Sequence, residues 1–361
     1  MDKEHEGRRK VRLADIAEQL GVSIVTVSKA IADKDGVSEE LRIRIKAVAE
    51  QMGYTQKNRS PLPGRKDDST GNIGVVIPSH FFERSTSFYW SMYNALSREL
   101  ILRGYYAIME QLSSRDEFDL VLPQVVQNRK VDGVILLGQT SEDYAHFFSR
   151  QYKDNIFLDF YVDDRDNDSV TTDNFYGEYQ MTRYLISQGH KDILYVGNFN
   201  ATTSITDRFM GFMKAMLENG YRVSVDDIIN DRNQNGFYEQ LRLPEKMPTA
   251  FVCNCDETAR RLIGILKEKG YSVPQDISVV GFDNFLSDGQ QTDPALTTVE
   301  VDPVAMARTA VDMLLKKISG EPYTHGHTVI GGRLLLRDSV RKINEGGGLW
   351  TSGYLRNCGM S

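Results

Sequence analysis

The stretch from Val11 to Ser38 constrains this chain more than any other, because it has the residue pattern of a helix-turn-helix. Apolar residues recur at three- and four-residue steps from Leu13 to Leu20, which is typical of one face of an amphipathic helix. Gly21 suits a tight turn because it tolerates positive φ, and Ser23 is placed to cap a second helix. A third apolar series runs from Leu41 to Met52. The sequence therefore predicts a three-helix head whose second helix fits the major groove of DNA.

Charged residues are distributed unevenly along the 361-residue chain, whose formal net charge is −7. Residues 1–66 contain fourteen Lys and Arg against ten Asp and Glu, so this part carries +4 and the remainder carries −11. A basic head joined to an acidic body is compatible with DNA binding, because the head supplies the local positive charge.

The body alternates short apolar runs with amphipathic stretches of ten to sixteen residues. Continuous apolar strands that alternate with helices indicate parallel sheets covered on both faces. Residues 55–72 interrupt this pattern with a polar segment rich in Pro and Gly, which predicts a linker. The predicted strands are residues 73–78, 105–109, 131–138, 155–160, 192–197, 249–253 and 277–282.

Several classes of protein are disfavoured by what the sequence lacks. No run of eighteen apolar residues could span a membrane, and the start MDKEHEGRRK has no apolar signal-peptide core. Three cysteines form no disulfide framework, so we expect a cytoplasmic protein. Alternation along one strand would place Cys253 and Cys255 on the same face, and no histidine lies nearby, so we expect no metal site and no cofactor.

The head resembles the DNA-binding domain of the lactose-repressor (LacI/GalR) family. The motif D-I-A-x-x-x-G-V-S-x-x-T-V-S-K runs from Asp15 to Lys29, with Val37-Ser38 and Gly53-Tyr54 following, and the resemblance continues to about Arg341. It implies a multidomain chain with an all-α helix-turn-helix head and an α/β two-lobed, periplasmic-binding-protein-like body of parallel sheets. The expected parts are residues 1–58 for the head, 59–72 for the hinge, 73–341 for the body and 342–361 for a tail expected to be disordered.

The resemblance also implies that the chain crosses between two lobes near Val162, Pro294 and Gly320, and that two bodies pair as a homodimer. The tail lacks the leucine heptads that a tetramerising helix would need.

The family pattern places base-reading side chains at the start of the second helix. Ile24 and Val25 can sense thymine methyl groups, and Lys29 can reach guanine O6 and N7. A leucine in the hinge of relatives wedges into the minor groove, and Leu62 lies nearest to that position, between two prolines. The DNA-binding set is Ser23, Ile24, Val25, Thr26, Ser28, Lys29 and Leu62, in which the hydroxyl side chains are expected to contact phosphates.

Effector-binding residues are implied by matches at predicted strand ends. Asp283 matches the G-[FY]-D motif, and Arg208 matches R-x-x-G-[FW]. An aspartate after a strand is often only a helix N-cap, and this alternative stays open for Asp173 and Asp256. The effector-binding set is Ser87, Phe88, Tyr89, Asp159, Arg208, Cys255, Asp256 and Asp283.

The sequence thus predicts a ligand-responsive transcriptional regulator, expected to be a repressor, that binds double-stranded operator DNA. Most of the family binds sugars or sugar phosphates, and a minority binds nucleobases or nucleosides, so both effector classes stay open. An α/β enzyme is the alternative from another class, but none of the phosphate-loop, nucleophile-elbow or zinc-protease motifs occurs, and we expect no catalytic residues. An extracytoplasmic sugar-binding protein would need a signal peptide and would lack the head.

Overall fold

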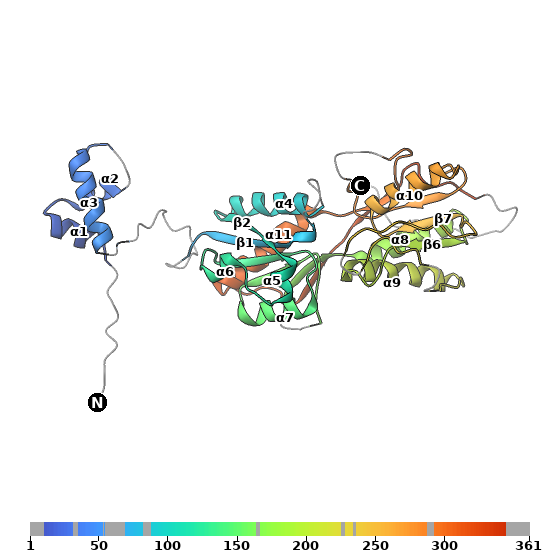
Figure 1. Cartoon of the computed structure of the whole chain (residues 1–361), viewed down its shortest axis with the longest axis horizontal. Helices are drawn as coiled ribbons and strands as arrows, with labels where there is room; N and C mark the ends of the chain where they lie inside the picture. The colour runs from blue at the N-terminus through green and yellow to red at the C-terminus, as the bar shows by residue number, and fades with distance from the viewer. Residues whose placement is uncertain are drawn as a thin grey trace, which may run out of the picture. The chain divides into compact units, whose positions relative to one another are not determined.

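The computed structural model describes residues 11–31, 35–52, 54, 69–81, 88–163, 167–224, 228–233, 236–286 and 292–343. These residues belong to two compact units, Met1–Arg65 and Lys66–Ser361 (Figure 1). Leu62, the expected hinge contact, and the tail from residue 344 lie outside the described residues. No helix of the described part is both long and apolar enough to cross a membrane.

The first unit contains the three predicted helices: α1 (Leu13–Leu20), α2 (Ile24–Ile31) and α3 (Glu39–Gln51). Gly21 ends α1 with φ 66°, the left-handed conformation that favours glycine. The amide of Thr26 donates to Oγ of Ser23 at 3.0 Å, so the predicted N-cap is confirmed. The core of this unit is formed by Ile16, Ala17, Val27, Ala30, Ile45 and Ala49.

Lobe 1 of the second unit is built on a six-stranded parallel sheet with the order β10-β5-β4-β3-β1-β2. Ile73 and Val75 pack toward α4 and α11, whereas Val76 packs toward α6 and α7, because alternate residues of a strand face opposite sides. Figure 1 shows α4 on one side of this sheet and α5, α6 and α7 on the other. The elements are β1 (Asn72–Pro78), η1 (Ser79–Phe81), α4 (Phe88–Leu102), β2 (Tyr106–Leu112), α5 (Ser114–Phe118), α6 (Gln124–Gln127), β3 (Gly133–Leu137), α7 (Glu142–Gln151), β4 (Asn155–Leu158), β5 (Ser169–Thr172), α11 (Pro303–Ser319) and β10 (His327–Ile330).

Lobe 2 has a smaller parallel sheet with the order β6-β7-β8. Tyr195 and Val252 pack toward α8 and α9, and Val196 and Phe251 pack toward α10. An antiparallel pair, β9 and β11, lies beside it. The elements are α8 (Asn174–Ser187), β6 (Ile193–Val196), α9 (Thr203–Glu218), β7 (Ala250–Cys253), α10 (Asp256–Glu268), β8 (Ser278–Val280), β9 (Thr298–Glu300) and β11 (Arg333–Leu335).

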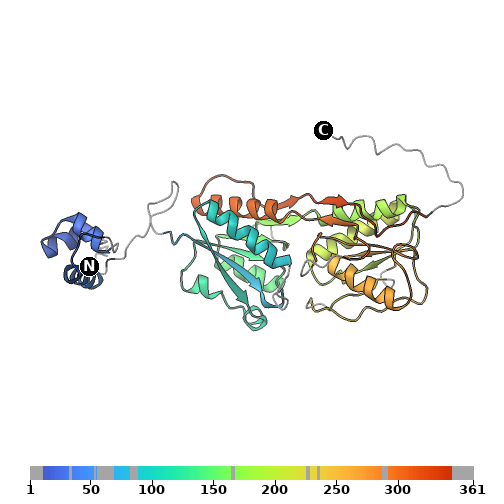
Figure 2. The ribbon, with the colours of Figure 1, turned by 90° about the horizontal axis from the view of Figure 1, so that it is seen from above.

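The chain crosses between the lobes three times, as expected, but later than predicted at each place. The crossings lie at residues 172–174, 300–303 and 330–333, not near Val162, Pro294 and Gly320. The reason is that β5 and β10 complete the sheet of lobe 1, and β9 forms in lobe 2, before each crossing. Figure 2 shows the red C-terminal segments running across both lobes along one side.

Candidate functional site

The first candidate surface is the outward face of α2. The side chains of Ile24 and Val25 are 52% and 64% exposed, and Lys29 is also exposed on this helix. Val27 and Ala30, on the opposite face, are fully buried against α1 and α3. Helical periodicity therefore leaves two aliphatic side chains and one cation available to a partner. Of the other predicted contacts, Ser23 and Ser28 are exposed, and Thr26 is half-buried with Oγ1 2.8 Å from Oγ of Ser23.

The second candidate site is a cavity of about 220 Å³ between the two lobes. Asp159, Cys255 and Asp283 reach it from the carboxyl ends of β4, β7 and β8, which is where open α/β sheets bind ligands. Lobe 1 contributes His80, Phe81, Phe88, Tyr89 and Asp159, and lobe 2 contributes Thr202, Ser204, Ile205, Arg208, Arg232, Gly236, Phe237, Tyr238, Asn254, Cys255, Glu257, Asp283 and Phe285.

Asp256 does not line this cavity, although the sequence placed it among the effector contacts. Its carboxylate is buried and accepts a hydrogen bond from Oγ1 of Thr298 at 2.6 Å, so it faces β9. It is not an N-cap either, because α10 begins at Asp256 and Cys255 is the capping residue. Asp173 does cap α8, since its carboxylate accepts from the amide of Tyr176 at 3.0 Å.

The sequence also made expectations for Ser87 and for the pair Cys253 and Cys255. Ser87 lies outside the described residues. Cys253 and Cys255 do not share a strand face: β7 ends at Cys253, which packs against α10, and Cys255 follows the strand and lines the cavity. The predicted strand, residues 249–253, ends where β7 ends, so the alternation assumed for the two cysteines does not extend to Cys255.

Asp159 is the polar residue that lobe 1 contributes to the cavity after β4. Its backbone has φ 70°, and its carboxylate accepts a hydrogen bond from the hydroxyl group of Tyr89 at 2.9 Å. Burial raises the pKa of Asp159 to about 6, although Arg208 and the Tyr89 hydroxyl oppose the shift. The cavity therefore contains a carboxyl group that can both accept and, when protonated, donate a hydrogen bond.

Asp283 occupies the corresponding place in lobe 2, after β8. Its backbone has φ 95°, and Oδ1 accepts from the amide of Phe285 at 2.9 Å. Burial raises the pKa of Asp283 above its ordinary value, against the effect of Arg208. The backbone of Asp256 also forms a hydrogen bond with this carboxyl group, which lines the cavity and so can contact a ligand.

Arg208 reaches the cavity from α9. Its Nε donates to Oδ1 of Asn174 at 2.8 Å, and Nη1 donates to the carbonyl oxygen of Asn254 at 2.5 Å. The guanidinium group stacks on the ring of Phe282, 3.9 Å from its centre. Three neighbours thus fix the orientation of Arg208.

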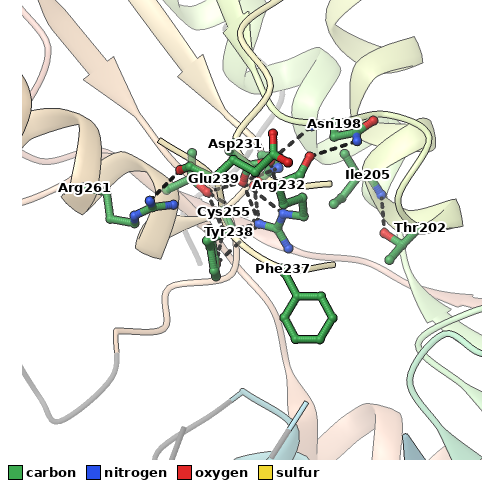
Figure 3. Close-up of polar contacts among 12 residues, drawn as sticks. Asn198, Thr202, Ile205, Asp231, Arg232, Phe237, Tyr238, Glu239, Cys255 and Arg261 are labelled. Atoms are coloured by element: carbon green, nitrogen blue, oxygen red, sulfur yellow. Dashed lines mark hydrogen bonds and ion pairs between the residues drawn. The ribbon is translucent and has the colours of Figure 1, made fainter. Parts of the chain in front are cut away.

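A polar cluster around Asp231 and Arg232 was missed by the sequence reasoning (Figure 3). Nε and Nη2 of Arg232 bind the Asp231 carboxylate at 3.0 and 2.7 Å, and the guanidinium lies over the ring of Tyr238 at 4.5 Å. Burial alone would raise the pKa of Asp231, but the charge and hydrogen bonds of Arg232 and the hydroxyl of Thr258 hold it below its ordinary value. Asp231 is therefore an ionised carboxylate inside lobe 2.

The signal that could have located this cluster is the Ile228-Ile229 pair after α9. Ile229 forms an isolated parallel bridge with Val196 at the edge of the lobe 2 sheet. The residues that follow it consequently reach the same carboxyl edge as Cys255 and Asp283. Two apolar residues are too few to predict a strand from the sequence alone.

Aromatic rings surround the polar groups from both lobes. Phe88 and Phe285 meet edge to face across the cavity, with ring centres 6.1 Å apart. His80 and Phe237 lie 6.5 Å apart, again from opposite lobes. Aromatic faces beside carboxylates and guanidinium groups suit a small ligand that has both apolar faces and polar edges.

Two regions of this chain match described families. Residues 12–57 match the bacterial regulatory proteins of the lacI family, and residues 182–340 match a periplasmic binding protein-like domain. The chain is 29% identical over 345 residues to the HTH-type transcriptional repressor PurR of Glaesserella parasuis serovar 5 (strain SH0165), covering 92% of this chain and 99% of that protein. It is 30% identical over 344 residues to the HTH-type transcriptional regulator RegA of Clostridium saccharobutylicum, covering 91% and 98%.

Solved structures show the same fold. A lac repressor dimer bound to operator and the anti-inducer ONPF has a TM-score of 0.65 at 20% identity, covering 92% of this chain and all of that chain. A LacI family transcriptional regulator from Enterococcus faecium with bound ribose has a TM-score of 0.61 at 24% identity, covering 76% of this chain and all of that chain. The expected architecture of a helix-turn-helix head and a two-lobed α/β body is therefore confirmed.

Proposed function

This chain belongs to the lacI family of bacterial regulatory proteins, and from this membership we propose how its two units act together. It is a ligand-responsive, DNA-binding transcriptional repressor. In our proposal, the face of α2 reads the operator, and the cavity between the lobes binds the small molecule that changes operator affinity. The proposal involves no catalytic step and places the protein in the cytoplasm, where bacterial operator DNA lies.

The DNA-reading role of α2 is supported by its exposed face. Ile24 and Val25 would contact thymine methyl groups, and Lys29 would reach guanine O6 and N7 in the major groove. Ser23, Thr26 and Ser28 would bind phosphates and set the register without reading bases. Leu62 is kept as the proposed minor-groove contact of the hinge.

The observation that carries the effector proposal is that Asp159, Arg208 and Asp283 line one cavity shared by both lobes. Carboxyl and guanidinium groups bind the hydroxyl groups of a sugar, and the surrounding rings cover its apolar face. The cavity is smaller than the ~300–1,000 Å³ usual for drug-sized ligands, which favours a sugar-like molecule of one ring. The remaining proposed contacts are Phe88, Tyr89 and Cys255.

We propose a homodimer, because one head offers too few base contacts for specific affinity and two heads would read two half-sites. The lac repressor, which shares this fold, is a dimer on its operator. Light scattering at micromolar concentration should give about twice the chain mass of 40.9 kDa, whereas a monomer would contradict the proposal.

Fluorescence anisotropy tests the effector role directly. Operator fragments would be selected from random DNA with the full chain, and sugars and nucleobases would then be screened for a change in affinity for the selected site. Asp283→Asn should reduce the response by about 1–3 kcal/mol and leave basal DNA affinity unchanged. Asp338→Asn, an exposed substitution of the same chemistry outside the cavity, is the control. Equal responses in both variants would remove the cavity from the mechanism.

A further inference from the structure

Arg232 presents one end of its guanidinium group to the cavity. Nε and Nη2 are bound to Asp231, and Nη2 also lies 3.2 Å from Oδ1 of Asn254 and 3.4 Å from Sγ of Cys255. Nη1 has no partner among the described residues, although Arg232 lines the cavity. The bidentate contact with Asp231 and the ring of Tyr238 fix the plane of the group, so the open nitrogen has a defined direction (Figure 3).

Arg208 supplies a second cation, whose two hydrogen-bond acceptors are both neutral oxygens. Its two hydrogen bonds end on the side-chain oxygen of Asn174 and the backbone oxygen of Asn254, and Nη2 has no partner in the described part of the chain. The side chain is only 8% exposed. The carboxyl groups of Asp159 and Asp283 act on this guanidinium group through their charge, but neither is hydrogen-bonded to it, so Nη2 can still pair with an anionic group of a ligand.

Asn254 brings the two arginines together. Arg208 binds its backbone oxygen and Arg232 binds its side-chain oxygen, so both guanidinium groups approach the cavity around one residue. Burial raises the pKa of Asp159 and Asp283, so these neighbouring carboxyl groups take up a proton more readily than exposed carboxyl groups do.

We propose that Arg232 and Arg208 together form a subsite for an anionic group, so that the effector is a polyhydroxylated molecule carrying a carboxylate or a phosphate. Guanidinium groups recognise both anions by the same paired N–H donors. This inference rests on the proposed function of the cavity as the effector site, and it assigns Arg232 as the residue that distinguishes charged from neutral ligands.

The thiol of Cys255 provides a test that needs no known effector. The full chain would carry Cys358→Ser, so that this third cysteine does not react. Cys255 would then be labelled in separate reactions with two methanethiosulfonates, an anionic sulfonatoethyl reagent and a cationic trimethylammonioethyl reagent. Cys253 is fully buried, and a Cys255→Ser variant gives the background. The ratio of the two rates cancels the thiolate fraction, so it reports only the local charge. We expect the ratio of the anionic to the cationic labelling rate to be about tenfold higher at Cys255 than with free N-acetylcysteine.

Arg232→Gln should abolish this preference, and Arg232→Lys should retain most of it because the charge is kept. Arg261→Gln is a matched control, since Arg261 also packs on the ring of Tyr238, at 4.6 Å, but does not line the cavity. A ratio that is the same in the parent and Arg232→Gln would overturn the proposal, and so would an equal loss in Arg261→Gln.

Ligand binding provides the second arm. Thermal unfolding of the full chain would be followed with ribose, glucose and galactose, with their terminal phosphates, and with ribonate, glucuronate and galacturonate. For at least one sugar, we expect its phosphate or its acid to raise the unfolding temperature while the neutral sugar does not. Arg232→Gln should abolish this rise. Phosphates and carboxylates in separate wells identify which anion is bound. Stabilisation by a neutral sugar that also changes operator affinity would overturn this inference while leaving the proposed function intact. If no compound stabilises the chain, the thiol ratio decides.

Discussion

Tyr161 donates a hydrogen bond from its hydroxyl group to Oδ1 of Asp207, 2.9 Å away, and so joins lobe 1 to helix α9 of lobe 2. The ring of Tyr161 also lies 4.8 Å from the ring of His327 on β10. A second contact across the lobes is made by Oε1 of Gln139, which accepts from the amide and hydroxyl groups of Thr203. These hydrogen bonds hold the cavity walls together, so they set the lobe orientation that an effector has to stabilise or change.

Tyr161→Phe should loosen the lobes, because one hydrogen bond of about 0.5–1.5 kcal/mol is removed. We expect faster labelling of Cys255 by a neutral thiol reagent in a Cys358→Ser background. Tyr271→Phe, in lobe 2 and outside the cavity, serves as the control. Identical labelling rates in all three proteins would show that this hydrogen bond does not limit access to the cavity.

Gly211→Ala should destabilise the protein and Gly264→Ala should not, although both glycines lie within helices. A Cβ at Gly211 would collide with the backbone oxygen of Phe175 on α8, whereas a Cβ at Gly264 has open space. We expect a loss of about 1–3 kcal/mol for the first substitution and a gain of about 0.5–1 kcal/mol for the second. Urea unfolding of the full chain measures both. Because Gly211 lies in the same helix as Arg208, its close packing also fixes the position of that side chain.

Glu178 should make stability depend on pH. Its carboxylate is fully buried without a hydrogen-bond partner among the described residues, and burial raises its pKa from 4.5 to about 8. The folded state therefore holds a proton that the unfolded chain releases, so stability falls as pH rises from about 4.5 to 8. Glu178→Gln removes this loss. The free energy of unfolding of the variant minus that of the parent should therefore be about 1–3 kcal/mol larger at pH 8.5 than at pH 5. The exposed Glu321→Gln should show no such change, and parallel pH profiles for all three proteins would contradict the assignment.

Lys29→Ala should weaken binding to the selected operator by about 1–3 kcal/mol and relax the preference at one base pair in each half-site. Lys246→Ala removes an exposed lysine from the body and is the charge control. Competition binding with single-base variants of the site measures both effects. A uniform loss across all variants would assign Lys29 to a phosphate instead of a base.

The helix-turn-helix was predictable from the sequence because its determinants are local. The spacing of Ile16, Val27 and Ala30 places them in one core, and Ser23 caps the next helix through a residue three positions away. Body strands such as β1 and β3 were located for the same reason, since their continuous apolar runs are buried on both faces. Strands β5 and β10 were not predicted, because Ser, Thr and His interrupt their apolar residues. Arg208 lines the cavity, as its match to the family motif implied. It lies within a long amphipathic helix, and the periodicity of such a helix shows which face each residue occupies.

The composition of the cavity was decided only by tertiary structure. Asp256 and Cys255 are adjacent, yet Asp256 faces β9 and Cys255 faces the cavity, because β7 has ended at Cys253 and α10 begins at Asp256. Arg232 follows an isolated bridge residue, Ile229, which the sequence does not reveal, and the pairing of Ile229 with Val196 carries Arg232 to the sheet edge. Periodicity reports which residues share a face of one element. Which elements end at the same cavity depends on sheet order and on where each strand stops, and these are set by contacts between residues distant in the chain.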